Sequence, residues 1–205
     1  MFNKISDRSQ AVAVSLKKGF TLVELLIVIA ILAVLAAAVV IVLNPAELLA
    51  QSRDAQRISD FETLNSALAI YIAQASTIDL GSCPAGGRCT YSPGAGNGPF
   101  ATTTCTFNAS TNNVTGTGWI DVNLASTPGG SPIPYLPVDS SNTASYFYAY
   151  GCSESPNYVF ELNGRLESAK HRVKMTTDGG SDNTCSTYLE NTCFYELGTD
   201  AALDL

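Results

Sequence analysis

The residue with the most unusual chemical surroundings is Glu24, a carboxylate inside an almost wholly apolar stretch. Across residues 20–43 the only other polar side chain is that of Thr21. An ionised carboxylate in hydrocarbon costs at least a few kcal/mol unless a partner compensates its charge. We therefore expect Glu24 to have a partner and a function.

Cysteines form a second candidate group, and all of them follow the apolar stretch. An even number of cysteines, confined to a region that would cross a membrane, favours disulfides formed in an oxidising compartment. Zinc binding is the weaker alternative, because there is no C-x-x-C pair and His171 is the only histidine. Short loops favour two pairings, Cys185 with Cys193 and Cys83 with Cys89, although six cysteines allow 15 pairings. The six are Cys83, Cys89, Cys105, Cys152, Cys185 and Cys193.

A third group of oxygen-bearing side chains lies near the C-terminus, in a run that contains two glycines. Its members are Asp178, Ser181, Asp182 and Asn183. Such oxygens are ligands for calcium, but the spacing is not that of an EF-hand, and a plain solvated turn is the alternative. We expect no cofactor other than calcium at this run, and zinc only as the weaker alternative at the cysteines. The single histidine, His171, lies between Lys170 and Arg172 and is interpreted as part of a solvated basic patch.

Composition argues against two functional classes. The formal net charge is −7; residues 1–19 carry +3, so the remainder carries −10. An acidic remainder does not suit nucleic-acid binding, which needs a basic face. The sequence has no Gly-x-Ser-x-Gly, no phosphate-binding glycine loop and no metalloprotease motif, so we do not expect an enzyme.

The elements that position these groups begin with a membrane span. Residues 20–43 would form a helix of about 36 Å at 1.5 Å per residue, which exceeds the bilayer core of about 30 Å. The preceding residues are basic and lack the long apolar core of an ordinary secretory signal. Basic residues on that side predict an N-in, C-out orientation. The cysteines would then lie outside the cytoplasm, in agreement with disulfides.

A second helix is predicted over residues 44–78. The sequence Asn44-Pro45-Ala46-Glu47 either begins a new helix or kinks one long helix. Beyond it, apolar residues recur at helical spacing and predict one packed face. We expect the helix to end between residues 77 and 81. The apolar positions are Ala55, Ile58, Phe61, Leu64, Leu68, Tyr71 and Ala75, and the face between them carries Arg53, Asp54, Arg57, Asp60 and Glu62.

Residues 79–205 are predicted to form an extracytoplasmic, β-rich head with disulfides. Alternating patterns predict strands at 119–124, 145–151 and 158–162, with a short strand at 193–197. The second and third would be antiparallel neighbours, and Asn163-Gly164 is either a tight turn or a bulge. Trp119 and the tyrosine stripe at 146, 148 and 150 are expected to pack in the core. The fold class is therefore α+β, with a long N-terminal helix packed on a small antiparallel sheet.

The stretch from Lys17 to Leu26, KKGFTLVELL, resembles the class III signal of type IV prepilins and type II secretion pseudopilins. The match is nearly complete over residues 17–38, while beyond about residue 80 only the general plan agrees. The resemblance implies that residues 1–19 are a leader, that a prepilin peptidase cuts between Gly19 and Phe20, and that the new Phe20 amine is methylated. In many relatives a helix-breaking proline lies nearer the start than Pro45 does here.

Processing of this kind suggests a partner for Glu24. The free Phe20 amine of a neighbouring subunit would pair with Glu24, so that apolar helices 20–43 bundle in a filament core. The alternative is that Glu24 only stabilises its own helix N-terminus, an effect of about 0.3–1 kcal/mol. We favour the intersubunit pair because a dipole effect alone does not justify a charge in lipid.

Three functions compete. The first is a subunit of a type IV pilus-like filament, with other pilin subunits, the prepilin peptidase, and the inner-membrane assembly platform and its ATPase as partners. The second is a pseudopilin of a type II protein secretion system, and the third is a membrane-anchored protein that never polymerises. Before assembly the chain would sit in the lipid of the inner membrane. The cysteines favour a pilin, whereas the run at residues 178–183 favours a pseudopilin, since major pseudopilins bind calcium in a C-terminal loop.

Overall fold

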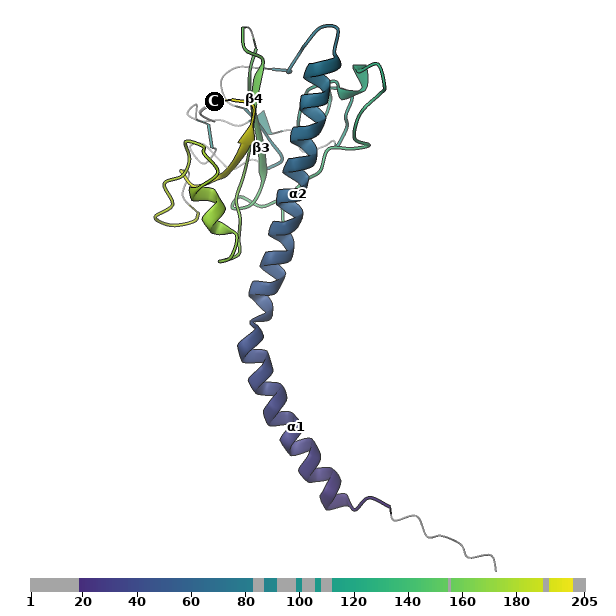
Figure 1. The fold of residues 1–205 in the computed structure, drawn as a ribbon, viewed down its shortest axis with the longest axis vertical. Helices are drawn as coiled ribbons and strands as arrows, with labels where there is room; N and C mark the ends of the chain where they lie inside the picture. Colours follow the sequence, from purple (N-terminus) through teal and green to yellow (C-terminus); the bar gives the residue numbers. More distant parts are fainter. Residues whose placement is uncertain are drawn as a thin grey trace, which may run out of the picture. The chain divides into compact units, whose positions relative to one another are not determined.

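The protein divides into two compact units, Met1–Asn44 and Pro45–Leu205. The computed structural model describes residues 19–82, 87–91, 99–100, 106–107, 112–154, 156–189 and 192–200. The first unit contributes one long apolar helix, and the second contributes a helix packed on a small sheet (Figure 1). This is the predicted α+β, pilin-like plan.

Helix α1 (Leu22–Leu43) buries none of its residues. Within its 22 residues, a window of 18 residues has a mean hydropathy of 3.5, and the helix is long and apolar enough to cross a membrane. It ends at Asn44, whose φ of 40° lies in the left-handed region that asparagine tolerates better than most residues. Pro45 then opens α2, where its missing N–H costs no helical hydrogen bond. Of the two predicted alternatives, a second helix begins here.

Helix α2 (Pro45–Gln74) packs with a face that differs from the predicted one. Phe61, Leu64, Leu68 and Tyr71 are buried as expected, but Ala55 is exposed. In its first half the buried stripe is charged, since Asp54, Arg57 and Asp60 are buried rather than solvated. The prediction was wrong because it placed the charged side chains of α2 in solvent. Charged side chains can be buried when charged partners from other elements compensate them.

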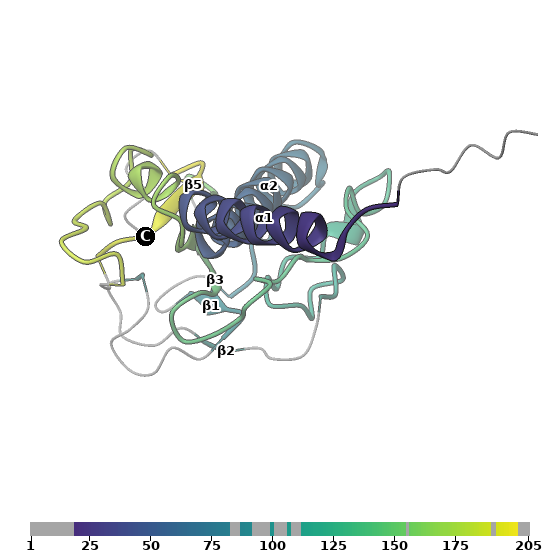
Figure 2. The same cartoon turned by 90° about the horizontal axis from the view of Figure 1, so that it is seen from below.

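The sheet has the strand order β2-β1-β3-β4-β5 within the described residues. The β1–β2 pair is parallel, and the other three pairs are antiparallel. Helix α2 covers one face of this sheet (Figures 1 and 2), where the Phe61 ring lies 4.8 Å from Tyr148 and 5.8 Å from Tyr195. The strands are β1 (Arg88–Cys89), β2 (Thr106–Phe107), β3 (Tyr148–Ser153), β4 (Val159–Gly164) and β5 (Tyr195–Gly198).

Three predicted strands correspond to β3, β4 and β5, and β3 and β4 are antiparallel neighbours as predicted. Gly164 is neither a turn nor a bulge, because it pairs with Tyr148 on one side and with Tyr195 on the other. A Cβ at Gly164 would lie 2.6 Å from the Phe61 ring, so glycine here lets α2 approach the sheet.

The predicted strand at residues 119–124 is wrong. This segment is a loop that leads into a short 3₁₀ helix, η1 (Leu124–Ser126). Its apolar residues do not alternate between two faces, since Trp119 and Ile120 are both buried in the main core with Val122. The Trp119 indole N–H donates to the carbonyl of Pro137 at 2.9 Å. This buried loop therefore has a composition similar to that of a strand.

Candidate functional site

The N-terminal end of α1 carries the candidate processing and assembly residues. Gly19 and Phe20 precede the helix, and 84 % of the Phe20 surface is exposed. Nothing within 4 Å would meet a Cβ at Gly19. An open, extended segment with a small residue before the bond suits a peptidase that must approach the backbone closely.

Glu24 forms a capping box with Thr21, the N-cap residue of α1. Its Oε2 accepts from the Thr21 backbone N–H at 2.9 Å and from the Thr21 hydroxyl at 2.8 Å. In return the Thr21 hydroxyl oxygen accepts from the Glu24 N–H at 3.2 Å. Such a box satisfies two N–H groups that a helix N-terminus leaves open. It gives Glu24 local hydrogen bonds, and no cation among the described residues pairs with it. The Thr21 side of this pattern was not recognised in the sequence.

The remaining surface of α1 is aliphatic on every side. Its large residues expose between 46 % (Val28) and 82 % (Val42) of their surface. A helix that is apolar all round is stable only in lipid or among other apolar helices. The exposed apolar surface of α1 therefore has to be covered, either by a membrane or by further copies of such a helix.

Residues 15–40 match the model of a family described as the prokaryotic N-terminal methylation motif. This motif is the class III prepilin signal, and its presence supports the interpretation of the chain as a type IV pilin-like or pseudopilin-like protein. The signal implies processing by a peptidase, membrane anchoring, and assembly with other pilin-type subunits. Comparisons with curated proteins and with solved structures gave no match for the chain. The role of the head must therefore be argued from its own structure.

In the second unit, the most heavily charged feature is a buried network centred on Arg57, which we call the Arg57 network. The guanidinium lies 2.5 Å from Asp139 and 2.8 Å from Asp54, and all three residues are buried. Its third contact is Glu167, at 3.4 Å. Glu167 also pairs with Arg53 at 2.5 Å. The network thus ties α2 to the loops before β3 and after β4.

Hydrogen bonding decides the charge states within this network. Burial alone would raise the pKa of Asp54, but bonds from Ser168, from the Glu167 N–H and from Arg57 outweigh it and lower that pKa. Burial would likewise lower the pKa of Arg57, but Asp139 and Asp54 raise it well above its ordinary value. Both groups are therefore charged at neutral pH. His171 lies at the edge of this cluster, with Nδ1 3.8 Å from Asp54, rather than in a fully solvated patch.

The cysteine predictions concern two regions. The structure has a disulfide between Cys185 and Cys193, the pair that the short spacing predicted. Cys89 and Cys152 are disulfide-bonded as well. Cys83 and Cys105 lie outside the described residues, so the predicted pairing of Cys83 with Cys89 stays a prediction.

The predicted calcium residues lie beside β5. The carboxylate of Asp178 accepts from the N–H groups of Glu196 and Gly180, at 3.0 and 3.3 Å. Asn183 donates its side-chain amide to the Gly180 carbonyl at 3.1 Å, and Ser181 is exposed. In the described part of the chain no three His, Cys, Asp or Glu side chains are grouped so that they could hold a metal ion. The calcium site stays a prediction.

The same loop belongs to a cluster of acidic side chains that the sequence did not reveal. The Glu196 carboxylate accepts from the Asp182 N–H at 2.9 Å and is almost completely buried. Burial, with the nearby charges of Glu161, Asp182 and Asp178, raises the pKa of Glu196 to about 9. Burial and the charge of Glu161 raise the pKa of Asp182 to about 6. Among the described residues, Asp182 Oδ2 and Glu196 Oε1 are buried without a hydrogen-bond partner.

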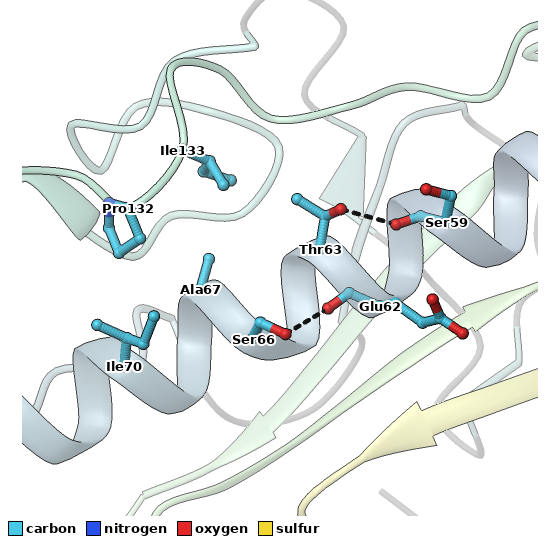
Figure 3. Close-up of a pocket in the computed structure, with 8 residues that line it drawn as sticks. All are labelled: Ser59, Glu62, Thr63, Ser66, Ala67, Ile70, Pro132 and Ile133. Carbon is cyan, nitrogen blue, oxygen red and sulfur yellow. Dashed lines mark hydrogen bonds between the residues drawn. The ribbon is translucent and has the colours of Figure 1, made fainter.

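A groove of about 360 Å³ lies between α2 and the loop at residues 132–133 (Figure 3). Two of its three hydroxyl groups donate to helix carbonyls, Thr63 to that of Ser59 and Ser66 to that of Glu62, both at 2.8 Å. Glu62 supplies the one charged side chain of the groove's lining. The groove has no nucleophile beside a base, and it offers no basis for catalysis. It is lined by Ser59, Glu62, Thr63, Ser66, Ala67, Ile70, Pro132 and Ile133.

Proposed function

We propose that this protein is a structural subunit of a type IV pilus-like filament. Its precursor would be cut between Gly19 and Phe20, methylated on the Phe20 amine, and assembled through α1. The observation that carries the proposal is the methylation motif at residues 15–40 on a helix with no buried residue. We also propose that the subunit has no catalytic role and that the inner-membrane assembly platform and its ATPase assemble it.

In the proposed assembly step, the Glu24 carboxylate forms an ion pair with the Phe20 amine of a neighbouring subunit. The capping box supports this assignment, because it holds the carboxylate at the N-terminal end of α1 without neutralising it. A cap and the helix dipole together contribute on the order of 1 kcal/mol, whereas the loss of one partner from a buried ion pair costs about 3–5 kcal/mol. The pair would fix the axial register of neighbouring helices.

Mass spectrometry of the mature N-terminus tests the processing step. We expect a chain that begins at Phe20 and carries one methyl group on its amine. An intact leader, or a cut at another bond, would refute the proposed route. The orientation is tested separately by protease accessibility in spheroplasts, where an N-in, C-out chain exposes residues 79–205 to added protease.

A type II secretion pseudopilin is the second candidate, supported by the acidic loop at residues 178–183. Asp182 is the best placed of the predicted calcium ligands, because its buried Oδ2 has no partner among the described residues. Calcium that raises the melting temperature of the head by several degrees, with loss of the effect in D182N, would favour this candidate. Long surface fibres in electron micrographs would favour a pilus. A protein that stays monomeric in membranes and in sheared fractions would instead be the third alternative, an anchored protein that does not polymerise.

A further inference from the structure

The seven basic residues that follow residue 19 divide into two groups. Four have partners within the second unit: Arg53 pairs with Glu167, Arg57 belongs to its network, Arg88 pairs with Asp121, and Arg165 is buried with its guanidinium 4.2 Å from the Phe194 ring. The other three are Lys170, Arg172 and Lys174, within five residues of one another. Lys170 and Lys174 are exposed, and Arg172 is half-buried. In a head of negative net charge, this local concentration of positive charge is an exception.

These residues lie on the short helix η2 (Arg172–Thr176) and just before it, against the first turns of α2. The Lys170 N–H donates to the Glu47 carboxylate at 3.4 Å, and the Ser168 N–H donates to Asp54 at 2.7 Å. Figure 1 shows this segment, in light green, beside the N-terminal half of α2. The contacts fix η2 to the part of α2 that directly follows α1 in the chain.

Chain connectivity then limits how far this segment can be from a membrane that holds α1. Glu47 is four residues after Leu43, so their Cα atoms are at most about 15 Å apart whatever angle the two helices make. The polar headgroup layer is about 5–8 Å thick, and the field of an anionic surface extends about 8–10 Å beyond it. The start of α2, whose Glu47 carboxylate accepts from the Lys170 N–H, therefore lies within reach of that field.

Apolar side chains accompany the basic ones. Val173 exposes 58 % of its surface and Leu189 exposes 54 %. Tyr188 lies under the Arg172 guanidinium, 4.7 Å from its ring centre, and the Cys185–Cys193 disulfide closes the loop that carries Tyr188 and Leu189. Aromatic and basic residues beside exposed aliphatic ones are typical of surfaces that contact the membrane interface.

We propose that this surface, which we call the η2 patch, binds the anionic phospholipid headgroups of the membrane that holds α1. It comprises Lys170, Arg172, Val173, Lys174, Tyr188 and Leu189. Binding would orient the head on the outer face of the membrane before assembly, and incorporation into a filament would release it. The inference rests on the proposed membrane anchoring of α1.

The test uses the full chain in nanodiscs made of phosphatidylcholine alone or of phosphatidylcholine mixed with phosphatidylglycerol. Amide hydrogen exchange is followed over residues 168–176 and 185–189. We expect exchange in these segments to be slower by about fivefold or more in the anionic discs, and the difference to disappear at high salt. The variant K170Q/R172Q/K174Q should lose the difference, whereas K170R/K174R should keep it.

Two further variants keep the test decisive. S59D/T63D/S66D changes the net charge by the same amount in the groove between α2 and residues 132–133, outside the η2 patch, so it should retain the slow exchange. K170Q/K174Q leaves Arg172 on Tyr188 and should lose most of the effect even if the triple variant folds poorly. Equal exchange in both kinds of disc, or protection that follows the number of chains per disc rather than the lipid, would overturn the η2 patch. A chain that does not co-elute with any disc would instead refute the anchoring of α1.

Discussion

Helices α1 and α2 both carry charge among apolar neighbours, but they compensate it by different means. In α1 the carboxylate of Glu24 has hydrogen bonds from Thr21, and among the described residues it has no cation as a partner. In α2 the guanidinium of Arg57 contacts Asp54 and Asp139, and all three are buried within one chain. The comparison teaches that α2 is complete in a single subunit. The first helix is not, because its aliphatic surface is exposed along its whole length, and in our proposal its charge is paired only in the filament.

The largest expected effect is the loss of assembly on replacement of Glu24. If a neighbouring Phe20 amine supplies the counter-charge, E24Q leaves that amine unpaired among apolar helices, at a cost of about 3–5 kcal/mol per subunit. We expect no filaments by electron microscopy and an unchanged melting temperature of the head. The matched control is T21A, which removes only the capping hydroxyl, costs about 1 kcal/mol and should still assemble. Normal filaments from E24Q would show that assembly does not need the Glu24 charge, and α1 and α2 would then not differ in needing a partner from another subunit.

Replacement of Arg57 tests the other half of the comparison. R57A leaves two carboxylates, Asp54 and Asp139, buried without their cation, and we expect the free energy of unfolding to fall by about 3–5 kcal/mol. Denaturant unfolding of the full chain in detergent, followed by tryptophan fluorescence of Trp119, measures the loss. In the control R53A, a partly exposed pair is removed, and the expected change is about 0–1 kcal/mol. Similar values for both variants would show that the network does not hold α2 to the head.

A smaller effect is expected from the Cys185–Cys193 disulfide. The bond closes a loop with a sequence separation of 8. Loop-closure entropy for a loop of that size corresponds to about 2–3 kcal/mol. The variant C185S/C193S should lose that much stability in the same unfolding experiment, and it should also weaken lipid-dependent protection of Tyr188 and Leu189. Unchanged protection would mean that the loop is ordered without its bond.

The pH dependence of stability should reveal the acidic cluster beside β5. Because burial raises the pKa of Glu196 to about 9 and that of Asp182 to about 6, the folded state holds protons that the unfolded state has released. Stability is then greatest below about pH 4.5 for these groups, and it falls as the pH rises towards 9, by an amount on the order of 1–3 kcal/mol. E196Q should flatten the fall, as measured by melting temperatures between pH 5 and 9. A stability that rises over this range in the wild type would contradict the assignment.

The features that the sequence predicted well are those set by local pattern. The apolar length of residues 20–43, the basic leader and the isolated glutamate are sufficient to indicate α1 and the methylation motif. The alternating aromatics around Tyr148 and Phe160 similarly predicted the β3–β4 pair. These patterns depend on neighbours in the sequence, so no tertiary information was needed.

The features that escaped prediction depend on contacts between distant segments. Arg57 was expected in solvent because its partner Asp139 is 82 residues away, and the sequence around Arg57 does not indicate this ion pair. The segment around Trp119 has the composition of a strand, but its apolar residues fill the core from a loop. Arg172 and Tyr188 are in contact, 4.7 Å apart, although nothing in the local sequence around either residue indicates it.

The position of the Glu24 carboxylate in assembled protein tests the account most directly. A high-resolution cryo-electron microscopy map of filaments would give the distance between Glu24 and the Phe20 nitrogen of the next subunit. We predict a separation of at most about 4 Å, the range of an ion pair. Filaments in which Glu24 contacts only its own Thr21, with no amine of another subunit within that range, would contradict it.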